Sequence, residues 1–233
     1  MPDTAPTHVM KAAMHQLQYM PGLRFFAKMR AADLFIYLDD VQYEKREFQN
    51  RNRVRTGNGV QFLTVPVLVK GKFSQTIKEV KINPTYAWRE EHLRAIKINY
   101  GHARYLKDYL PVLETIYSGD YALLGEAALA TIVFLKDAFG IKTPTRLSSE
   151  FKVASTGAHR LVDLCEAAGA GEYYSGAGAR EYLDEKLFAE RKIKLSWQDF
   201  TVKPYPQAFG GFEPDLSALD LLLNCGPESI NYL

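Results

Sequence analysis

The chain has 233 residues, of which 47% are hydrophobic and 24% are charged, and its formal net charge is +2. These values are ordinary for a soluble globular protein and are not those of a disordered chain. The net charge is too small for the protein as a whole to attract nucleic acid or membranes electrostatically. Its two cysteines, Cys165 and Cys225, stand in apolar helical contexts and are expected to be buried thiols in a reducing compartment. The sequence shows no signal-peptide pattern and no apolar stretch that would span a bilayer, so we expect a cytoplasmic protein without a membrane partner.

The first apolar segments predict a strand, a helix and a strand in succession. After the Pro- and Thr-rich residues 1–8, which are expected to be frayed, an apolar run at 9–14 ends at His15. Helical spacing follows at residues 23–31, and a second apolar run at 34–38 ends at Asp39 and Asp40. Parallel strands of such a unit end at one edge of the sheet, where open α/β sheets bind ligands. We therefore expect His15 and the two aspartates at that edge.

The remaining pattern predicts an α/β protein with a Rossmann-like parallel sheet core. We expect one domain over residues 1–233, with a helical insertion at about residues 88–140. The other expected elements are a polar loop within residues 38–53, strands at 60–69, 71–82, 143–149, 172–175 and 193–200, and helices at 88–99, 105–117, 123–139, 159–168, 180–191 and 216–223.

The segment at residues 38–53 joins acids, arginines, amides and aromatic residues without an apolar period. Arg46 and Arg51 belong to its basic part, and guanidinium forks match the geometry of phosphate. Asn50 and Asn52 add neutral donors and acceptors. We expect an anion site here, and an acidic turn followed by a solvated basic loop is the alternative.

Catalytic candidates come from the same sheet edge. His15 is the expected base, and Asp39 or Asp40 would orient a reacting amine. The Ser175-Gly176 turn before an expected helix suits a phosphate, and a tight strand-to-helix turn is the alternative. No His or Cys pair has the spacing of metal ligands, so the sequence assigns no metal ligands and leaves a metal requirement open, and it assigns no cofactor.

Several of these segments together resemble the WbqC-like protein family, from about residue 10 to the C-terminus. They include His15-Gln16-x-x-Tyr19, Leu38-Asp39-Asp40-Val41-Gln42-Tyr43, Gln49-Asn50-Arg51-Asn52, Tyr174-Ser175-Gly176, Tyr205-x-Gln207 and Phe212-x-Pro214-x-x-Ser217-x-x-Asp220. Leu17, Gly22 and Arg24 depart from the usual family pattern. The substrate-binding residues that we expect are Gln16, Tyr19, Gln42, Tyr43, Arg46, Asn50, Arg51, Asn52, Ser175, Gly176, Tyr205 and Gln207.

The resemblance implies a role in O-antigen or other surface-polysaccharide biosynthesis. The hypothesis is an acyl or aminoacyl transferase, for example for glycine, that acts on a nucleotide-linked amino sugar. Its partners would be the nucleotide-sugar and, as one donor, an aminoacyl-tRNA. An ATP-dependent carboxylate-activating ligase and a non-catalytic nucleotide- or tRNA-binding module are the alternatives. The sequence assigns neither the sugar nor the oligomeric state.

Overall fold

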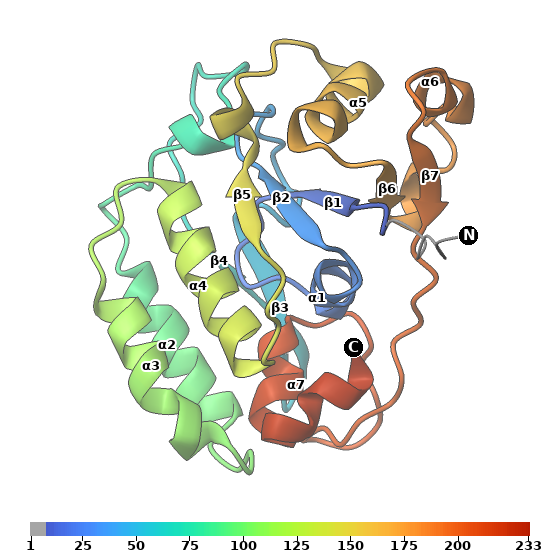
Figure 1. The fold of residues 1–233 in the computed structure, drawn as a ribbon. Coiled ribbons are helices and arrows are strands. Elements are labelled where there is room, and N and C mark those ends of the chain that lie inside the picture. Colours follow the sequence, from blue (N-terminus) through green and yellow to red (C-terminus); the bar gives the residue numbers. More distant parts are fainter. Residues whose placement is uncertain (1–7) are drawn as a thin grey trace. The chain divides into compact units, whose positions relative to one another are not determined.

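A parallel sheet with helices against it gives the chain an α/β, Rossmann-like fold (Figure 1). The computed structural model describes residues 8–233, so the expectation of a frayed segment at 1–8 falls almost wholly outside the described residues. The described chain forms two units. The first holds residues 8–15, 28–38 and 143–200, and the second holds residues 16–27, 39–142 and 201–233. The prediction of a single domain stays a prediction.

The first unit contains the five-stranded parallel sheet, in the order β5-β2-β1-β6-β7. The first strand of the chain is therefore central, and later strands are added on both sides of it, as in doubly wound sheets. This order confirms the Rossmann-like prediction. The strands are β1 (Lys11–Gln16), β2 (Leu34–Leu38), β5 (Thr145–Leu147), β6 (Glu172–Ser175) and β7 (Lys194–Trp197).

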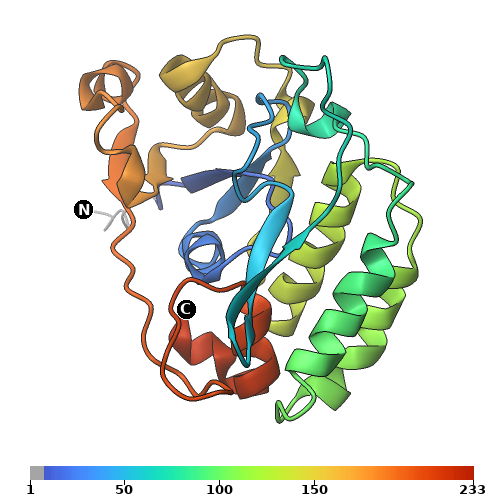
Figure 2. The same cartoon turned by 180° about the vertical axis from the view of Figure 1, so that it is seen from behind.

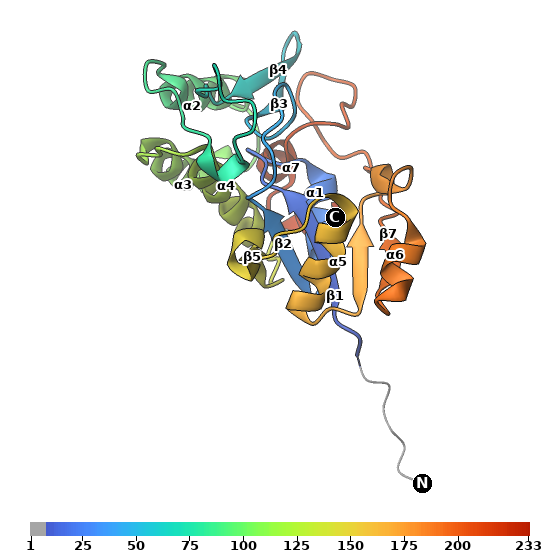
Figure 3. The same ribbon diagram turned by 90° about the horizontal axis from the view of Figure 1, so that it is seen from above.

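Burial explains why these segments are strands. The first four residues of β2 are buried, which is typical of a parallel strand that is covered on both faces. One face of the sheet packs on α5 (Gly157–Ala168) and α6 (Glu185–Glu190), and Figure 3 shows α6 beside β7. Within this core the ring of Phe188 stacks on that of Tyr173, with 5.4 Å between ring centroids.

The second unit holds a β-hairpin and most of the helices. Helices α2, α3 and α4 lie side by side, and Figure 2 shows the hairpin next to α7. Helix α1 carries the chain from the second unit into the first. The elements are β3 (Arg51–Thr56), β4 (Gly59–Thr64), α1 (Leu23–Arg30), α2 (Trp88–Asn99), α3 (Leu106–Ser118), α4 (Leu124–Ala138) and α7 (Ala218–Cys225). Short 3₁₀ turns of this unit are η1 (Ile77–Glu79) and η4 (Gly226–Tyr232), and those of the first unit are η2 (Ser148–Phe151) and η3 (Ala177–Ala179).

Three sequence predictions of secondary structure were wrong. The end of the expected polar loop is strand β3, because alternate residues at 52 and 54 are buried while the arginines between them pair across to β4. Residues 71–82 contain the 3₁₀ turn η1 and isolated bridges in place of the expected strand, because the buried Ile77 and Val80 are three residues apart and lie on one side of that turn. The helix expected from residue 180 begins only at Glu185, where the Asp184 side chain caps it.

Gly226 ends α7 with φ 54° and ψ −130°, a conformation that is open to glycine and costly for other residues. A Cβ atom at this position would lie 2.5 Å from the Tyr105 ring. We expect Gly226→Ala to lower the free energy of unfolding by about 3 kcal/mol or more, measured by urea denaturation. Gly71→Ala is the matched control, because Gly71 has φ 73° and no atom within 4 Å of such a Cβ. The control should lose only about 1 kcal/mol, and equal losses in the two variants would contradict the steric explanation.

Candidate functional site

The sheet edge at the carboxyl ends of β1 and β6 is the candidate active site of the first unit. The strand order reverses between these two neighbours, since β2 and β5 lie on one side of β1 and β7 lies beyond β6. Open α/β sheets bind ligands at such a switch point. Strand β1 ends at His15 and Gln16, and β6 ends at Ser175.

Lys28 of α1 places a buried amine at this switch point. Its Nζ atom donates a 2.8 Å hydrogen bond to the backbone oxygen of Met14, at the end of β1. The same Nζ atom lies 3.9 Å from the position that a Cβ atom on Gly176 would take, directly after β6. Lys28 is 5% exposed, and burial lowers the pKa of its amine to about 7. A lysine amine that is partly neutral at pH 7 can accept a proton or attack a carbonyl carbon.

His15 follows Met14 in the chain. It is the penultimate residue of β1 and is half-buried. Buried serines stand at the ends of two other strands of the sheet. Ser148 begins η2 directly after β5, and Ser175 closes β6.

The Ser175-Gly176 turn differs from the expectation. Gly176 leads into the three-residue turn η3, and the next α-helix begins only at Glu185. The turn therefore has no following α-helix whose N-terminus would bind phosphate. A binding role for Ser175 and Gly176 stays a prediction.

Asp39 and Asp40 directly follow β2 and open the second unit. Asp39 is 4% exposed, and its backbone oxygen accepts a 2.8 Å hydrogen bond from the Lys78 amide. Asp40 is half-buried. Their expected role in orienting an amine stays a prediction.

The amide side chains expected to bind substrate make hydrogen bonds within the second unit. Gln49 donates a 2.8 Å hydrogen bond to the side chain of Gln16. Asn50 donates to the backbone oxygen of Val65 at 2.8 Å, and Asn52 donates to that of Met20 at 2.7 Å. Each of these asparagines thereby fixes the path of a neighbouring segment, which is a structural use of the amide. Their expected binding roles stay predictions.

Arginines and aromatic rings share one face of the β3–β4 hairpin. The Arg51 guanidinium lies 4.5 Å from the centroid of the Phe62 ring and donates to the backbone oxygen of the exposed Arg46. Gln42 donates a 2.9 Å hydrogen bond to the backbone oxygen of Phe73, and Tyr43 is buried.

Tyr19 lies in a closed aromatic cluster and is fully buried. Its hydroxyl lies 2.9 Å from Nδ1 of His92 and 2.6 Å from the hydroxyl of Tyr117. Burial lowers the pKa of His92 to about 4, so the imidazole is neutral at pH 7. The geometry is that of a hydrogen-bonded interior cluster.

Tyr205 and Gln207 meet at the buried carboxylate of Asp220 on α7. The Tyr205 and Tyr100 hydroxyls each donate to this carboxylate at 2.8 Å, and the Gln207 amide donates at 2.9 Å. Burial raises the pKa of Asp220 despite these donors. In the sequence Asp220 stands out only as part of the family motif, and no local pattern indicates that three distant residues converge on it.

Comparisons with known proteins identify the family. The WbqC-like protein family matches residues 16–232 of this chain. The chain belongs to the WbqC-like protein family. The resemblance inferred from the motifs is thus confirmed. This WbqC-like chain is also 40% identical to the uncharacterized protein Rv1507c of Mycobacterium tuberculosis. The alignment extends over 228 residues and covers 96% of this chain and 97% of that relative. No solved structure matches it significantly.

Two further observations apply to residues 8–233 of this WbqC-like protein. No helix in that range is long and apolar enough to cross a membrane. Within the same range, no group of three or more His, Cys, Asp or Glu side chains has an arrangement that would hold a metal ion.

Proposed function

We propose that this WbqC-like protein transfers an acyl or aminoacyl group, for example glycine, to the amine of a nucleotide-linked amino sugar. The reaction would belong to the biosynthesis of O-antigen or another surface polysaccharide in the cytoplasm. The observation that carries the proposal is the pair of proton-accepting side chains, His15 and Lys28, which belong to the same switch point of the parallel sheet.

In the proposed reaction the neutral amine of the sugar attacks the carbonyl carbon of an activated ester or thioester. A C–N bond forms as the C–O or C–S bond to the carrier breaks. The proton of the attacking amine passes to the His15 imidazole and from there to the leaving oxygen or sulfur. An aminoacyl-tRNA is one carrier that fits this chemistry. The expected roles of Asp39 or Asp40 in orienting the amine, and of Arg46, Asn50 and Arg51 in holding phosphate, belong to the same proposal.

Replacement of His15 by alanine tests the assignment of the base. We expect turnover to fall roughly 100-fold or more, because a positioned proton acceptor contributes about that factor, while the dissociation constant of the nucleotide-sugar stays within about twofold. Single-turnover kinetics and calorimetric binding would be measured with the same preparations. His159→Ala is the matched control, since His159 is exposed on α5. Unchanged turnover in His15→Ala would remove His15 from the mechanism.

Finding the substrate comes before that measurement. Thermal denaturation of the protein with nucleotide-sugars, ATP and aminoacyl-tRNA is expected to show stabilisation by a nucleotide-linked amino sugar. Consumption of ATP in the presence of an amino acid would instead support the ligase. RNA binding that weakens steeply with salt and is accompanied by no transfer would support the binding module.

A further inference from the structure

A cavity of about 560 Å³ in the second unit carries an inference that is independent of the transfer reaction. It lies among the turn after α2, the loop before α7 and α7 itself. Its volume is within the range of small-molecule sites. The lining residues are Asn99, His102, Arg104, Pro206, Gln207, Ala208, Phe209 and Asn224.

The charge of this cavity is positive. Arg104 and His102 line it, and no acidic residue does. Within residues 8–233 neither side chain forms an ion pair with a carboxylate, and the Arg104 guanidinium lies 5.2 Å from the centroid of the neighbouring Tyr105 ring. An exposed guanidinium at the wall of a cavity without acids is suited to a phosphate group.

Three amide side chains that line the cavity are held in place by hydrogen bonds to the fold. Gln207 donates to the buried Asp220 carboxylate at 2.9 Å, and Asn224 donates to the backbone oxygen of Asp220 at 2.8 Å. Asn99 donates to the backbone oxygen of Ala95 at 2.9 Å. Asn99 and Asn224 thus each use one N–H group in the fold, and their amide oxygens remain for a ligand. Gln207 also donates to the backbone oxygen of Glu213 and accepts from its amide, so its side chain is used within the fold. The two fixed asparagine oxygens are able to accept hydrogen bonds from the hydroxyls of a sugar.

Phe209 adds an aromatic face. Its side chain is 49% exposed, and its φ of 67° lies in the left-handed region, where a non-glycine residue carries strain. Gly210 and Gly211, with φ of 69° and 66°, continue the same left-handed backbone. One edge of the ring faces Gly57, where a Cβ atom would lie 3.6 Å from Cε1 of Phe209, and Arg55 donates a 2.6 Å hydrogen bond to the backbone oxygen of Gly210. The loop is thus held against the hairpin, and the exposed part of the ring offers a face for stacking.

From these observations we propose that the cavity binds a nucleotide. Its phosphate groups would lie against Arg104 and His102, its ribose against the amides, and its base on the ring of Phe209. This chemistry needs neither His15 nor Lys28, so variants of the cavity residues test it separately from the transfer proposal.

The test is calorimetric titration of the full chain with UDP, ADP, uridine, adenosine and inorganic phosphate. We expect the nucleoside diphosphates to bind at least roughly 10-fold more tightly than the nucleosides or phosphate, because the two subsites act together. Absence of nucleotide binding at millimolar concentration, or binding of inorganic phosphate as tight as that of UDP and ADP, would overturn the proposal.

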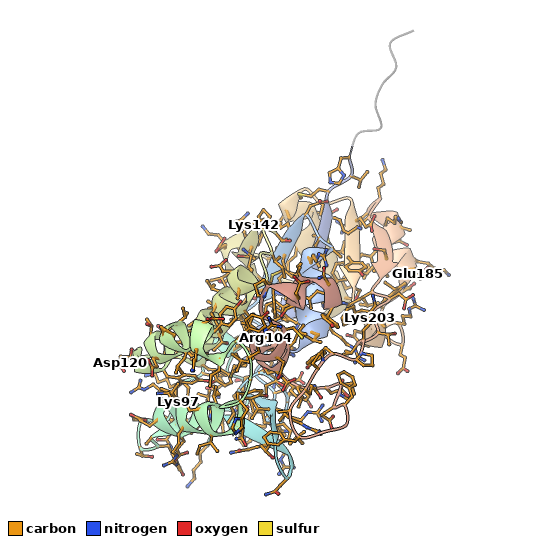
Figure 4. All side chains as sticks on the ribbon, turned by 90° about the horizontal axis from the view of Figure 1, so that it is seen from below. Lys97, Arg104, Asp120, Lys142, Glu185 and Lys203 are labelled. Atoms are coloured by element: carbon orange, nitrogen blue, oxygen red, sulfur yellow. The ribbon has the colours of Figure 1, made fainter. Side chains whose placement is uncertain are left out.

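Two variants separate the subsites. Arg104→Ala should weaken the nucleoside diphosphates roughly 10-fold and leave the nucleosides unchanged, whereas Phe209→Asn should weaken both classes roughly 5-fold or more. Asparagine tolerates the left-handed backbone of position 209, so this variant keeps the loop conformation. Lys97→Ala is the control, since the exposed Lys97 does not line the cavity and lies apart from Arg104 in Figure 4. Wild-type affinity in both Arg104→Ala and Phe209→Asn would show that nucleotides bind elsewhere.

Discussion

Replacing Lys28 by methionine is expected to stabilise the folded protein and to slow transfer strongly. Methionine keeps the length and the apolar packing of the buried side chain and removes the amine. Burial alone lowers the pKa of Lys28 from 10.5 to about 7, which corresponds to roughly 5 kcal/mol between the charged and neutral forms. After the lost hydrogen bond to Met14 is subtracted, we expect a gain of about 1–4 kcal/mol at pH 6.

The pH dependence gives this prediction its sign. Between pH 7 and 10.5 the unfolded chain holds the Lys28 proton and the folded chain releases it. The unfolded state therefore binds more protons in this window, and the contribution of Lys28 to stability rises with pH by up to about 1.4 kcal/mol per unit. Below pH 7 both states are protonated, so the destabilisation is fully present there. Lys28→Met should remove this part of the slope.

Urea denaturation at several pH values measures both effects. Lys142→Met is the matched control, because Lys142 is exposed, and it should leave stability and slope unchanged (Figure 4). Once the acceptor is identified, we expect turnover of Lys28→Met to fall roughly 100-fold or more. If Lys28→Met kept the wild-type pH slope, burial would not be lowering the pKa of the Lys28 amine. Full turnover in this variant would confine Lys28 to a structural role.

The regular elements of this fold were predictable because their apolar periods are strong. The run at residues 34–38 and the helix at 88–99 have the predicted bounds, since tertiary packing there follows the local pattern. Strand β3 was missed because Arg51, Arg53 and Arg55 replace the apolar residues that normally mark a strand. Their pairing with β4, rather than an apolar face, holds them extended.

The site was predictable only in part. The position of His15 at the end of a central parallel strand follows from the βαβ pattern. Lys28 was not among the predicted site residues, because a single lysine on a helix is usually exposed. Its buried neighbours Phe25, Phe26, Ala27 and Met29 were the available signal, since they leave no solvent-facing side for the amine.

Long-range convergence is the other limit, and Asp220 is its clearest case. The carboxylate receives hydrogen bonds from Tyr100, Tyr205 and Gln207, which come from separate segments of the second unit. No local period records which segments meet. The structure alone shows that a fully buried carboxylate joins them.

Asp220→Ala is expected to be the most destabilising single substitution in this cluster. It leaves two hydroxyls and one amide without their acceptor inside the protein, and each unsatisfied buried group costs about 1–3 kcal/mol. We therefore expect a loss of about 3–6 kcal/mol, which is a large part of the stability of an ordinary domain. Urea denaturation measures it, and a variant too unstable to purify agrees with the same expectation.

Asp220→Asn separates the hydrogen bonds from the charge. The amide keeps an acceptor oxygen and nearly the same shape, so we expect a loss of only about 1–2 kcal/mol. Asp215→Ala is the control, because Asp215 is exposed and pairs with Arg53 at 3.7 Å, and surface pairs contribute about 0–1 kcal/mol. Since Tyr205 donates directly to Asp220, the combination Asp220→Asn with Tyr205→Phe should cost less than the sum of the single changes. Additive losses would mean that the hydroxyl and the carboxylate stabilise the fold independently, and that Asp220 is not the point at which these segments are joined.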